Sequence, residues 1–91
     1  MAMIKADKII QFSEHALEQM QYRGATKEEV IETLKTCSHQ PAELGRFECR
    51  KEFPNDTQWR NHHYKTKQVR PIFVEESGKI IVITVYVYFI K

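Results

Sequence analysis

The last thirteen residues, KIIVITVYVYFIK, constrain the fold more than any other part of the chain. Lys79 and Lys91 bound eleven residues that are all β-branched or aromatic, a composition typical of a strand. Eleven residues are too few for a helix that crosses a bilayer, which needs about 20. The run therefore predicts one long central strand from Ile80 to Ile90, and no membrane-spanning segment.

The two faces of this strand differ, because successive side chains of a strand point to opposite sides. One row is wholly apolar and is predicted to face the core; it consists of Ile81, Ile83, Val85, Val87 and Phe89. The other row carries hydroxyl groups at its three middle positions, Thr84, Tyr86 and Tyr88. That row is either a platform for a ligand or an ordinary strand face with one wet side, since tyrosines suit both.

Two helices are predicted in the first half of the chain. Ser13 is a good N-cap for the first helix, and Gly24 supplies the left-handed residue that ends it. Thr26 and Glu29 form a capping box for the second helix, which Gln40-Pro41 stops. The apolar residues of both helices, expected beneath the core face of the last strand, are Leu17, Met20, Val30, Ile31 and Leu34.

After Pro41 the apolar period changes from near four to two, which indicates strands. Strands are expected at residues 44–53, 58–66 and 69–76, with turns at 54–56 and 76–79, and the pattern is compatible with a short strand at 8–12. Pro71 lacks an amide hydrogen and so predicts an edge position or an irregularity. The chain is therefore expected to form a single α+β domain over residues 1–91. In this domain two N-terminal helices pack on one face of a three- to four-stranded antiparallel sheet.

Charge is distributed unevenly along the chain, although 14 basic and 12 acidic residues leave a net charge of only +2. Residues 1–45 contain five basic and seven acidic residues, and residues 46–91 contain nine and five. The segment QWRNHHYKTKQVR, residues 58–70, has four cations, two histidines and two large aromatic residues but no carboxylate. Because cations suit phosphates and flat rings suit bases, this segment is either a nucleic-acid surface or an edge strand kept soluble by lysines.

Composition and missing motifs exclude several classes of protein. A hydrophobic content of 42 % with 29 % charged residues is ordinary for a soluble globular chain. The start of the chain lacks the apolar segment of a secretory signal, so a cytoplasmic protein is expected. Cys37 and Cys49 are expected as small buried hydrophobic residues, with a disulfide between them as the less favoured alternative. No pair of cysteines or histidines has zinc-finger spacing, and no phosphate-binding loop is present. We therefore expect neither a metal nor a cofactor.

The stretch FSEHALEQMQYRG, residues 12–24, contains the motif F-S-x-H-A-x-x-x-M-x-x-R-G. With the V-x-T-V-Y pattern at residues 82–86, it resembles the signature of a bacterial family of uncharacterised small proteins. That family is similar in layout to the RelE-like and BrnT-like toxins of toxin–antitoxin pairs. These toxins belong to the barnase–EndoU–colicin–RelE-like group of small metal-independent ribonucleases.

The resemblance implies a RelE-like fold with RNA on the open face of the sheet. It also implies a metal-independent endoribonuclease toxin that has an antitoxin-like protein as partner. A non-catalytic module on the same fold, which binds nucleic acid or protein, is the alternative.

The motif positions also imply a site. On an ideal helix His15 and Arg23 lie within about 100° of one another; histidine exchanges protons near neutrality, and arginine presents a planar fork to phosphate. Alternatively, His15 is a capping or packing residue and Arg23 answers the helix dipole. The predicted catalytic residues, which add His62 from the basic segment, are His15, Arg23, Tyr86 and His62. The predicted substrate-binding residues are Arg60, Tyr64, Lys65 and Thr84.

Overall fold

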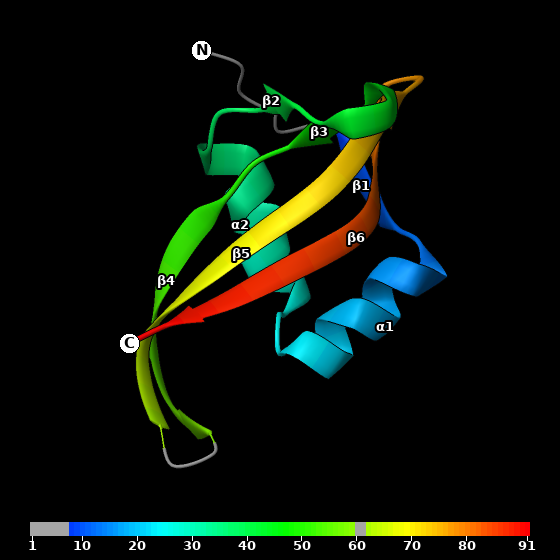
Figure 1. Cartoon of the computed structure of the whole chain (residues 1–91). Coiled ribbons are helices and arrows are strands. Elements are labelled where there is room, and N and C mark those ends of the chain that lie inside the picture. Colours follow the sequence, from blue (N-terminus) through cyan, green and yellow to red (C-terminus); the bar gives the residue numbers. More distant parts are fainter. Residues whose placement is uncertain (1–7, 60–61) are drawn as a thin grey trace.

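The computed structural model of the chain describes residues 8–59 and 62–91. In chain order the elements are β1 (Ile9–Phe12), α1 (Glu14–Arg23), α2 (Lys27–Thr36), β2 (Gln40–Pro41), the 3-10 turn η1 (Glu43–Gly45), β3 (Phe47–Glu48), β4 (Lys51–Trp59), β5 (His62–Glu76) and β6 (Lys79–Ile90). The strands form one sheet in the order β1-β6-β5-β3-β2, and β4 pairs with another part of β5 (Figure 1). The α+β class is as predicted.

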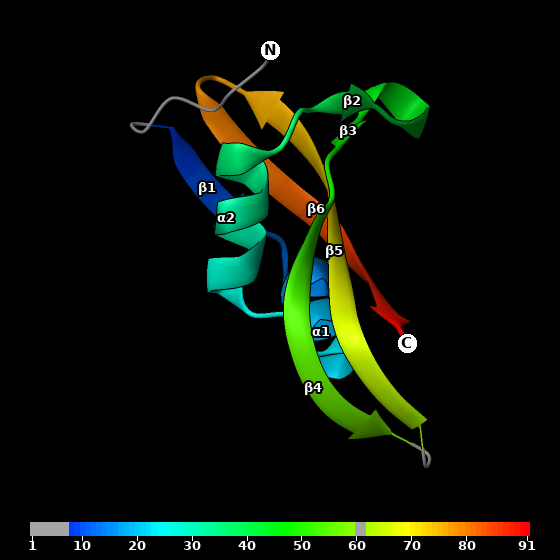
Figure 2. The ribbon, with the colours of Figure 1, turned by 90° about the vertical axis from the view of Figure 1, so that its left-hand side faces the viewer.

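The predicted three- to four-stranded antiparallel sheet is wrong. β1 pairs with β6 in parallel, from Ile9 opposite Lys79 to Phe12 opposite Val82, so the six-stranded sheet is mixed. The helices are also placed differently: α2 lies across one face of the sheet, whereas α1 runs along the outer side of β6 (Figures 1 and 2). The sequence can indicate that a short strand is present, but not which strand it pairs with or whether the pairing is parallel. The RelE-like arrangement of two helices on an antiparallel sheet is therefore not the fold of this chain.

α1 lies along β6 because residues at its two ends bond to carbonyl groups of that strand. The Ser13 amide donates to the Val82 carbonyl (3.0 Å), and the Ser13 hydroxyl, which also caps α1, donates to the Ile83 carbonyl (2.9 Å). At the other end Arg23 Nη1 donates to the Val85 carbonyl (2.9 Å). These bonds occupy carbonyl groups on the edge of β6 beyond its last pair with β1. α1 therefore lies where another strand could otherwise pair with β6.

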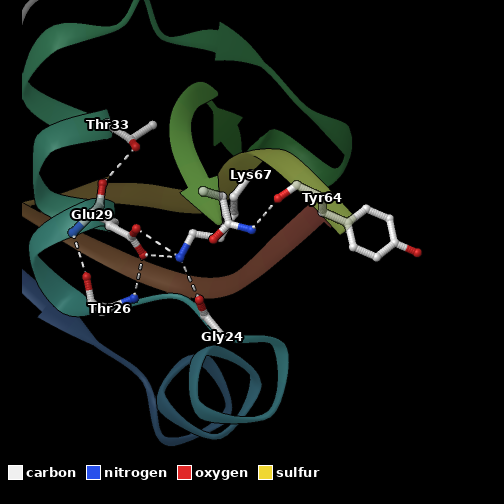
Figure 3. Close-up of polar contacts among 7 residues, drawn as sticks. Gly24, Thr26, Glu29, Thr33, Tyr64 and Lys67 are labelled. Carbon is white, nitrogen blue, oxygen red and sulfur yellow. Dashed lines mark hydrogen bonds and ion pairs between the residues drawn. The ribbon is translucent and has the colours of Figure 1, made fainter. Parts of the chain in front are cut away.

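A buried ion pair connects both helices to the sheet. Lys67 of β5 is only 8 % exposed, and its ammonium group donates to the Gly24 carbonyl (2.8 Å) and to the Glu29 carboxylate (2.9 Å) (Figure 3). Glu29 also completes the capping box with Thr26 that the sequence predicts. One carboxylate thus closes the first turn of α2 and neutralises a cation beneath the sheet.

The alternation predicted for β6 is interrupted by a β-bulge. Ile72 of β5 pairs with Thr84, but the next residue, Phe73, pairs with Val82. Ile83 is therefore an extra residue on β6, without a partner across the ladder. Beyond such a residue, the side chains of a strand exchange faces relative to a regular strand.

This bulge decides which side chains of β6 enter the core. On its C-terminal side Val85 is fully buried and Tyr86 is 38 % exposed, as alternation predicts. On its N-terminal side Ile80 and Val82 are fully buried and Ile81 only partly so, the reverse of the prediction. The predicted register is thus correct for one half of the strand and wrong for the other.

The core lies between the helices and the inner face of β5 and β6. Its buried side chains are Ala16, Met20, Ala25, Val30, Leu34, Cys49, Val69, Phe73, Ile80, Val82 and Val85. The predicted burial of Leu17 and Phe89 is wrong, since both are exposed by more than a third; α1 flanks the strand, so it buries a narrower stripe than a helix lying across the sheet. Within residues 8–59 and 62–91, neither helix has the length and apolar content needed to cross a membrane.

Residues 62–66 of the strand predicted at 58–66 and the whole strand predicted at 69–76 lie in one strand, β5, whereas Gln58 and Trp59 belong to β4. The turn predicted at 54–56 also lies within β4, where the pairing register shifts. Pro71 is buried within β5. Opposite it, the neighbouring chain is interrupted between Glu48, the last residue of β3, and Lys51, the first of β4. A proline cannot donate a ladder hydrogen bond, so the irregularity predicted at Pro71 appears as this break.

Candidate functional site

The face of the sheet opposite α2 has no α-helix over it in the part of the chain that the structure describes (Figure 2). The cross-strand pairs on this open face are Ile72–Thr84, Arg70–Tyr86 and Gln68–Tyr88. Tyr86 is 38 % and Tyr88 44 % exposed. The hydroxyl-bearing row predicted from the sequence does face away from the core, because all of it lies on the C-terminal side of the bulge.

Tyr86 contacts two guanidinium groups that come from different elements. The Cζ atom of Arg23, at the end of α1, lies 5.0 Å from the centroid of the Tyr86 ring, and that of Arg70 on β5 lies 5.6 Å from it. Arg70 Nη1 also donates to the Tyr88 hydroxyl (3.2 Å). Cation–π contacts orient planar cations against a ring, so this cluster joins two fixed positive charges to two exposed tyrosines.

Glu48 of β3 fixes Arg70 in this cluster through an ion pair between its carboxylate and Arg70 Nε. The hydrogen bond from Arg70 lowers the pKa of Glu48 below its ordinary value, although burial acts in the opposite direction. The same bond raises the pKa of Arg70. Both groups are therefore charged at neutral pH, and neither is suited to exchange a proton there.

The Glu48 carboxylate should make the stability of the domain depend on pH. Its pKa in the folded state lies below the ordinary 4.5, so the unfolded chain takes up the proton first as the pH falls. The stabilisation is complete above that ordinary value and is lost as the pH falls through the folded-state pKa. We expect the melting temperature of Glu48→Gln to fall less steeply than that of the wild type from about pH 5 to about pH 2. Glu52→Gln, at an exposed position on β4, is the control that should keep the wild-type slope; equal slopes for all three proteins would contradict the assignment.

A cleft opens on the open face beside Tyr86, between the sheet and the segment that joins β2 to β3. Its volume is about 550 Å³, within the range of roughly 300–1,000 Å³ found for small-ligand sites. Its lining residues are Pro41, Ala42, Glu43, Leu44, Arg46, Glu48, Arg70, Ile72, Thr84 and Tyr86. The 3-10 turn η1 stands on the side of the sheet opposite α2 (Figure 2), so the open face is walled at this end.

The structure places three of the predicted site residues near one another at β6. Arg23 contacts the Tyr86 ring, and Thr84 lines the same cleft as Tyr86 but is only 9 % exposed. His15 is exposed in the first turn of α1, roughly 12 Å along the helix from Arg23 at 1.5 Å per residue. Among the contacts of the described residues, none joins His15 to Arg23, Thr84 or Tyr86. His15 and Arg23 therefore lie on the same face of the helix but do not contact each other or a common residue of the proposed site.

The predicted residues of the basic segment lie at the far end of the β4–β5 hairpin; they are His62, Tyr64 and Lys65. Arg70, the partner of Tyr86, is eight residues beyond His62 on β5, roughly 26 Å away at about 3.3 Å per residue. His62 instead contacts Lys91, whose Nζ lies 2.9 Å from its Nδ1. Arg60 lies outside the described residues. The structure does not bring this group to Tyr86, because the hairpin extends well past the end of β6 (Figure 1).

Four charged residues of the cluster and cleft are absent from the predicted site: Glu43, Arg46, Glu48 and Arg70. Arg70 ends the basic segment from which other residues were chosen, and only the register between β5 and β6 shows that it is the one opposite Tyr86. Arg46 and Glu48 lie on the polar side of the strand predicted at 44–53, and that alternation is the one signal the sequence carries for them.

The two cysteines and His39 contact residues outside the cleft and form no metal site among the described residues. Within the described residues, no three His, Cys, Asp or Glu side chains gather as metal ligands would. Cys37 and Cys49 are free thiols, and burial raises the pKa of Cys49 to about 12, so its thiol stays protonated. His39 Nε2 lies 2.9 Å from the Leu34 carbonyl, and its ring packs edge-on against Phe73.

Comparison of the chain with protein-family models, curated proteins and solved structures found no match. The resemblance carried by the motif at residues 12–24 thus stays a prediction. A function for the chain therefore has to be inferred from the geometry of the open face.

Proposed function

We propose that the open face binds single-stranded RNA. The observation that carries the proposal is the pair of exposed tyrosines, Tyr86 and Tyr88, in contact with guanidinium groups on a sheet face without a covering helix. Bases stack on such rings, with about 1–3 kcal/mol per base, and arginine forks contact phosphate oxygens. Single-stranded RNA offers both unstacked bases and phosphates, and the Gln68 amide beside Tyr88 can bond to a 2′-hydroxyl.

The chemistry of the cluster favours binding over cleavage. Metal-independent cleavage of RNA needs groups that take up and release a proton near neutral pH. Arg23 and Arg70 keep their charge, and the pKa of Glu48 is lowered by its bond to Arg70. His15, which could exchange protons, contacts none of these residues. The proposed role is therefore a nucleic-acid-binding module, and the antitoxin-like partner that the resemblance implies stays a prediction.

Fluorescence anisotropy with a labelled eight-nucleotide RNA tests the proposal. Tyr86→Ala should weaken binding about tenfold or more, because one stacked base is lost, whereas Tyr86→Phe should retain the affinity. Tyr22→Ala is the matched control, since Tyr22 is an 89 % exposed tyrosine on α1, and it should bind as the wild type does. If Tyr86→Ala and Tyr22→Ala bind equally well, the open face is not the RNA surface.

Salt dependence and product analysis separate the alternatives. Affinity for single-stranded RNA should fall with salt, with a slope in log–log form of about −0.7 for each phosphate neutralised. Electrophoresis after incubation should show intact RNA. Shortened RNA with the wild type but not with His15→Ala would instead support the endoribonuclease. If the chain binds a protein partner and no RNA, the proposal fails and the protein-binding alternative gains.

A further inference from the structure

Two side chains of opposite charge, Glu43 and Arg46, line the cleft. Glu43 begins the η1 turn and Arg46 directly follows it, and the Arg46 amide donates to the Glu43 carbonyl (3.2 Å). Within the described chain, their side chains form no ion pair or hydrogen bond, with each other or with another residue. In the same cleft, Glu48 and Arg70 are bound to each other. The cleft therefore presents one carboxylate and one guanidinium group to which no described residue is bonded.

Leu44, which lies between these residues in the sequence, has an unfavourable backbone conformation and an exposed apolar side chain. Its φ of 62° is in the left-handed region, which a non-glycine residue seldom adopts, and its side chain is 85 % exposed. Leu44 lines the same cleft as the Tyr86 ring. A flat apolar group held in this space would be in contact with both side chains and would shield Leu44 from water.

Building on the RNA-binding function proposed above, we propose that this cleft receives one unpaired guanine base. Guanine has two neighbouring donors, N1–H and the N2 amino group, on one edge, and two neighbouring acceptors, O6 and N7, on another. A carboxylate such as Glu43 accepts a pair of donors, and a guanidinium such as that of Arg46 donates to O6 and N7. None of the other three bases offers both a donor pair and an acceptor pair. The cleft thus selects guanine through Glu43 and Arg46, while Tyr86 and Leu44 contact the ring.

Four labelled RNA octamers test this site: octauridylate, and three oligomers in which one central uridine is replaced by guanosine, adenosine or cytidine. The wild type should bind the guanosine oligomer about tenfold more tightly than octauridylate, as expected for bidentate base contacts, and should not prefer the other two. Glu43→Gln should abolish the preference, because an amide cannot accept from both donors. Arg46→Lys should also reduce it, because lysine keeps the charge but lacks the fork.

A matched control and three outcomes complete the test. Glu52→Gln removes the same charge from an exposed position on β4 and should keep the guanine preference. Equal binding of all four oligomers by the wild type would overturn the guanine site and leave the RNA-binding function standing. Failure to bind any oligomer would overturn both. A guanine preference that survives in Glu43→Gln and Arg46→Lys would show that these residues do not read the base.

Discussion

Val85→Asp is expected to leave the chain unfolded at room temperature. Val85 is fully buried on the inner side of β6, opposite Pro71 of β5, which is itself buried. An unpaired carboxylate in an apolar core is very costly, and a domain has only about 5–15 kcal/mol of stability to lose. Circular dichroism should show loss of the native spectrum, and urea titration should show no cooperative transition.

The neighbouring residue supplies the control for this prediction. Tyr86 is exposed on the opposite face of β6, so Tyr86→Phe should change the free energy of unfolding by less than about 1 kcal/mol. A Val85→Asp protein that unfolds cooperatively with wild-type stability would show that Val85 is not in the core. The register of the second half of β6, and with it the placement of Tyr86, would then be wrong.

Lys67→Met is expected to lower the free energy of unfolding by about 3 kcal/mol or more, the usual cost of removing one partner of a buried ion pair. The Lys67 and Glu29 side chains are only 10 % and 21 % exposed, and the Gly24 carbonyl depends on the same ammonium group. For a domain of this size, the melting temperature should fall by at least about 12 °C, at about 4–8 °C per kcal/mol.

The source of this loss can be separated from a general effect of lysine removal. Lys65→Met, at an exposed position on the same strand, should leave the melting temperature nearly unchanged. Glu29→Gln should destabilise the Lys67→Met protein less than it destabilises the wild type, because the charge that it removes is already unpaired. Additive effects of the two substitutions would mean that the ion pair contributes nothing of its own.

Three of the four helix ends could be predicted from the sequence because their signals are local; α2 ends at Thr36, before the Gln40-Pro41 pair that was predicted to stop it. Ser13, Gly24 and the Thr26–Glu29 capping box act within one turn of the chain, and all of them cap the helices as predicted. The parallel pairing of β1 with β6 could not be predicted in this way, because it joins Ile9 to Lys79, which are distant in the sequence. Alternating patterns reveal strands, but they carry no information on which strand lies beside which.

The candidate site follows the same division. The outward face of Thr84 and Tyr86 was predicted, because both lie in the half of β6 where simple alternation holds. Arg70 was missed and His62 chosen instead, since the sequence does not show how far the β4–β5 hairpin extends past β6. The register alone places Arg70 opposite Tyr86. Charged residues that are close together in the sequence of one segment can thus lie far apart in the folded protein.

The bulge at Ile83 limits the ways in which β6 can pair at all. In a regular strand, a slip of one residue exchanges the two faces along its whole length. The core-facing side chains of the two halves of β6 would lie on opposite faces of a regular strand. Any pairing without the bulge would therefore place the apolar side chains of only one half in the core and expose those of the other. The Ser13 hydroxyl, 70 residues away in sequence, bonds to the carbonyl of the extra residue. The N-cap residue of α1 is therefore bonded to β6 at the bulge, in the pairing register that places the apolar side chains of both halves in the core.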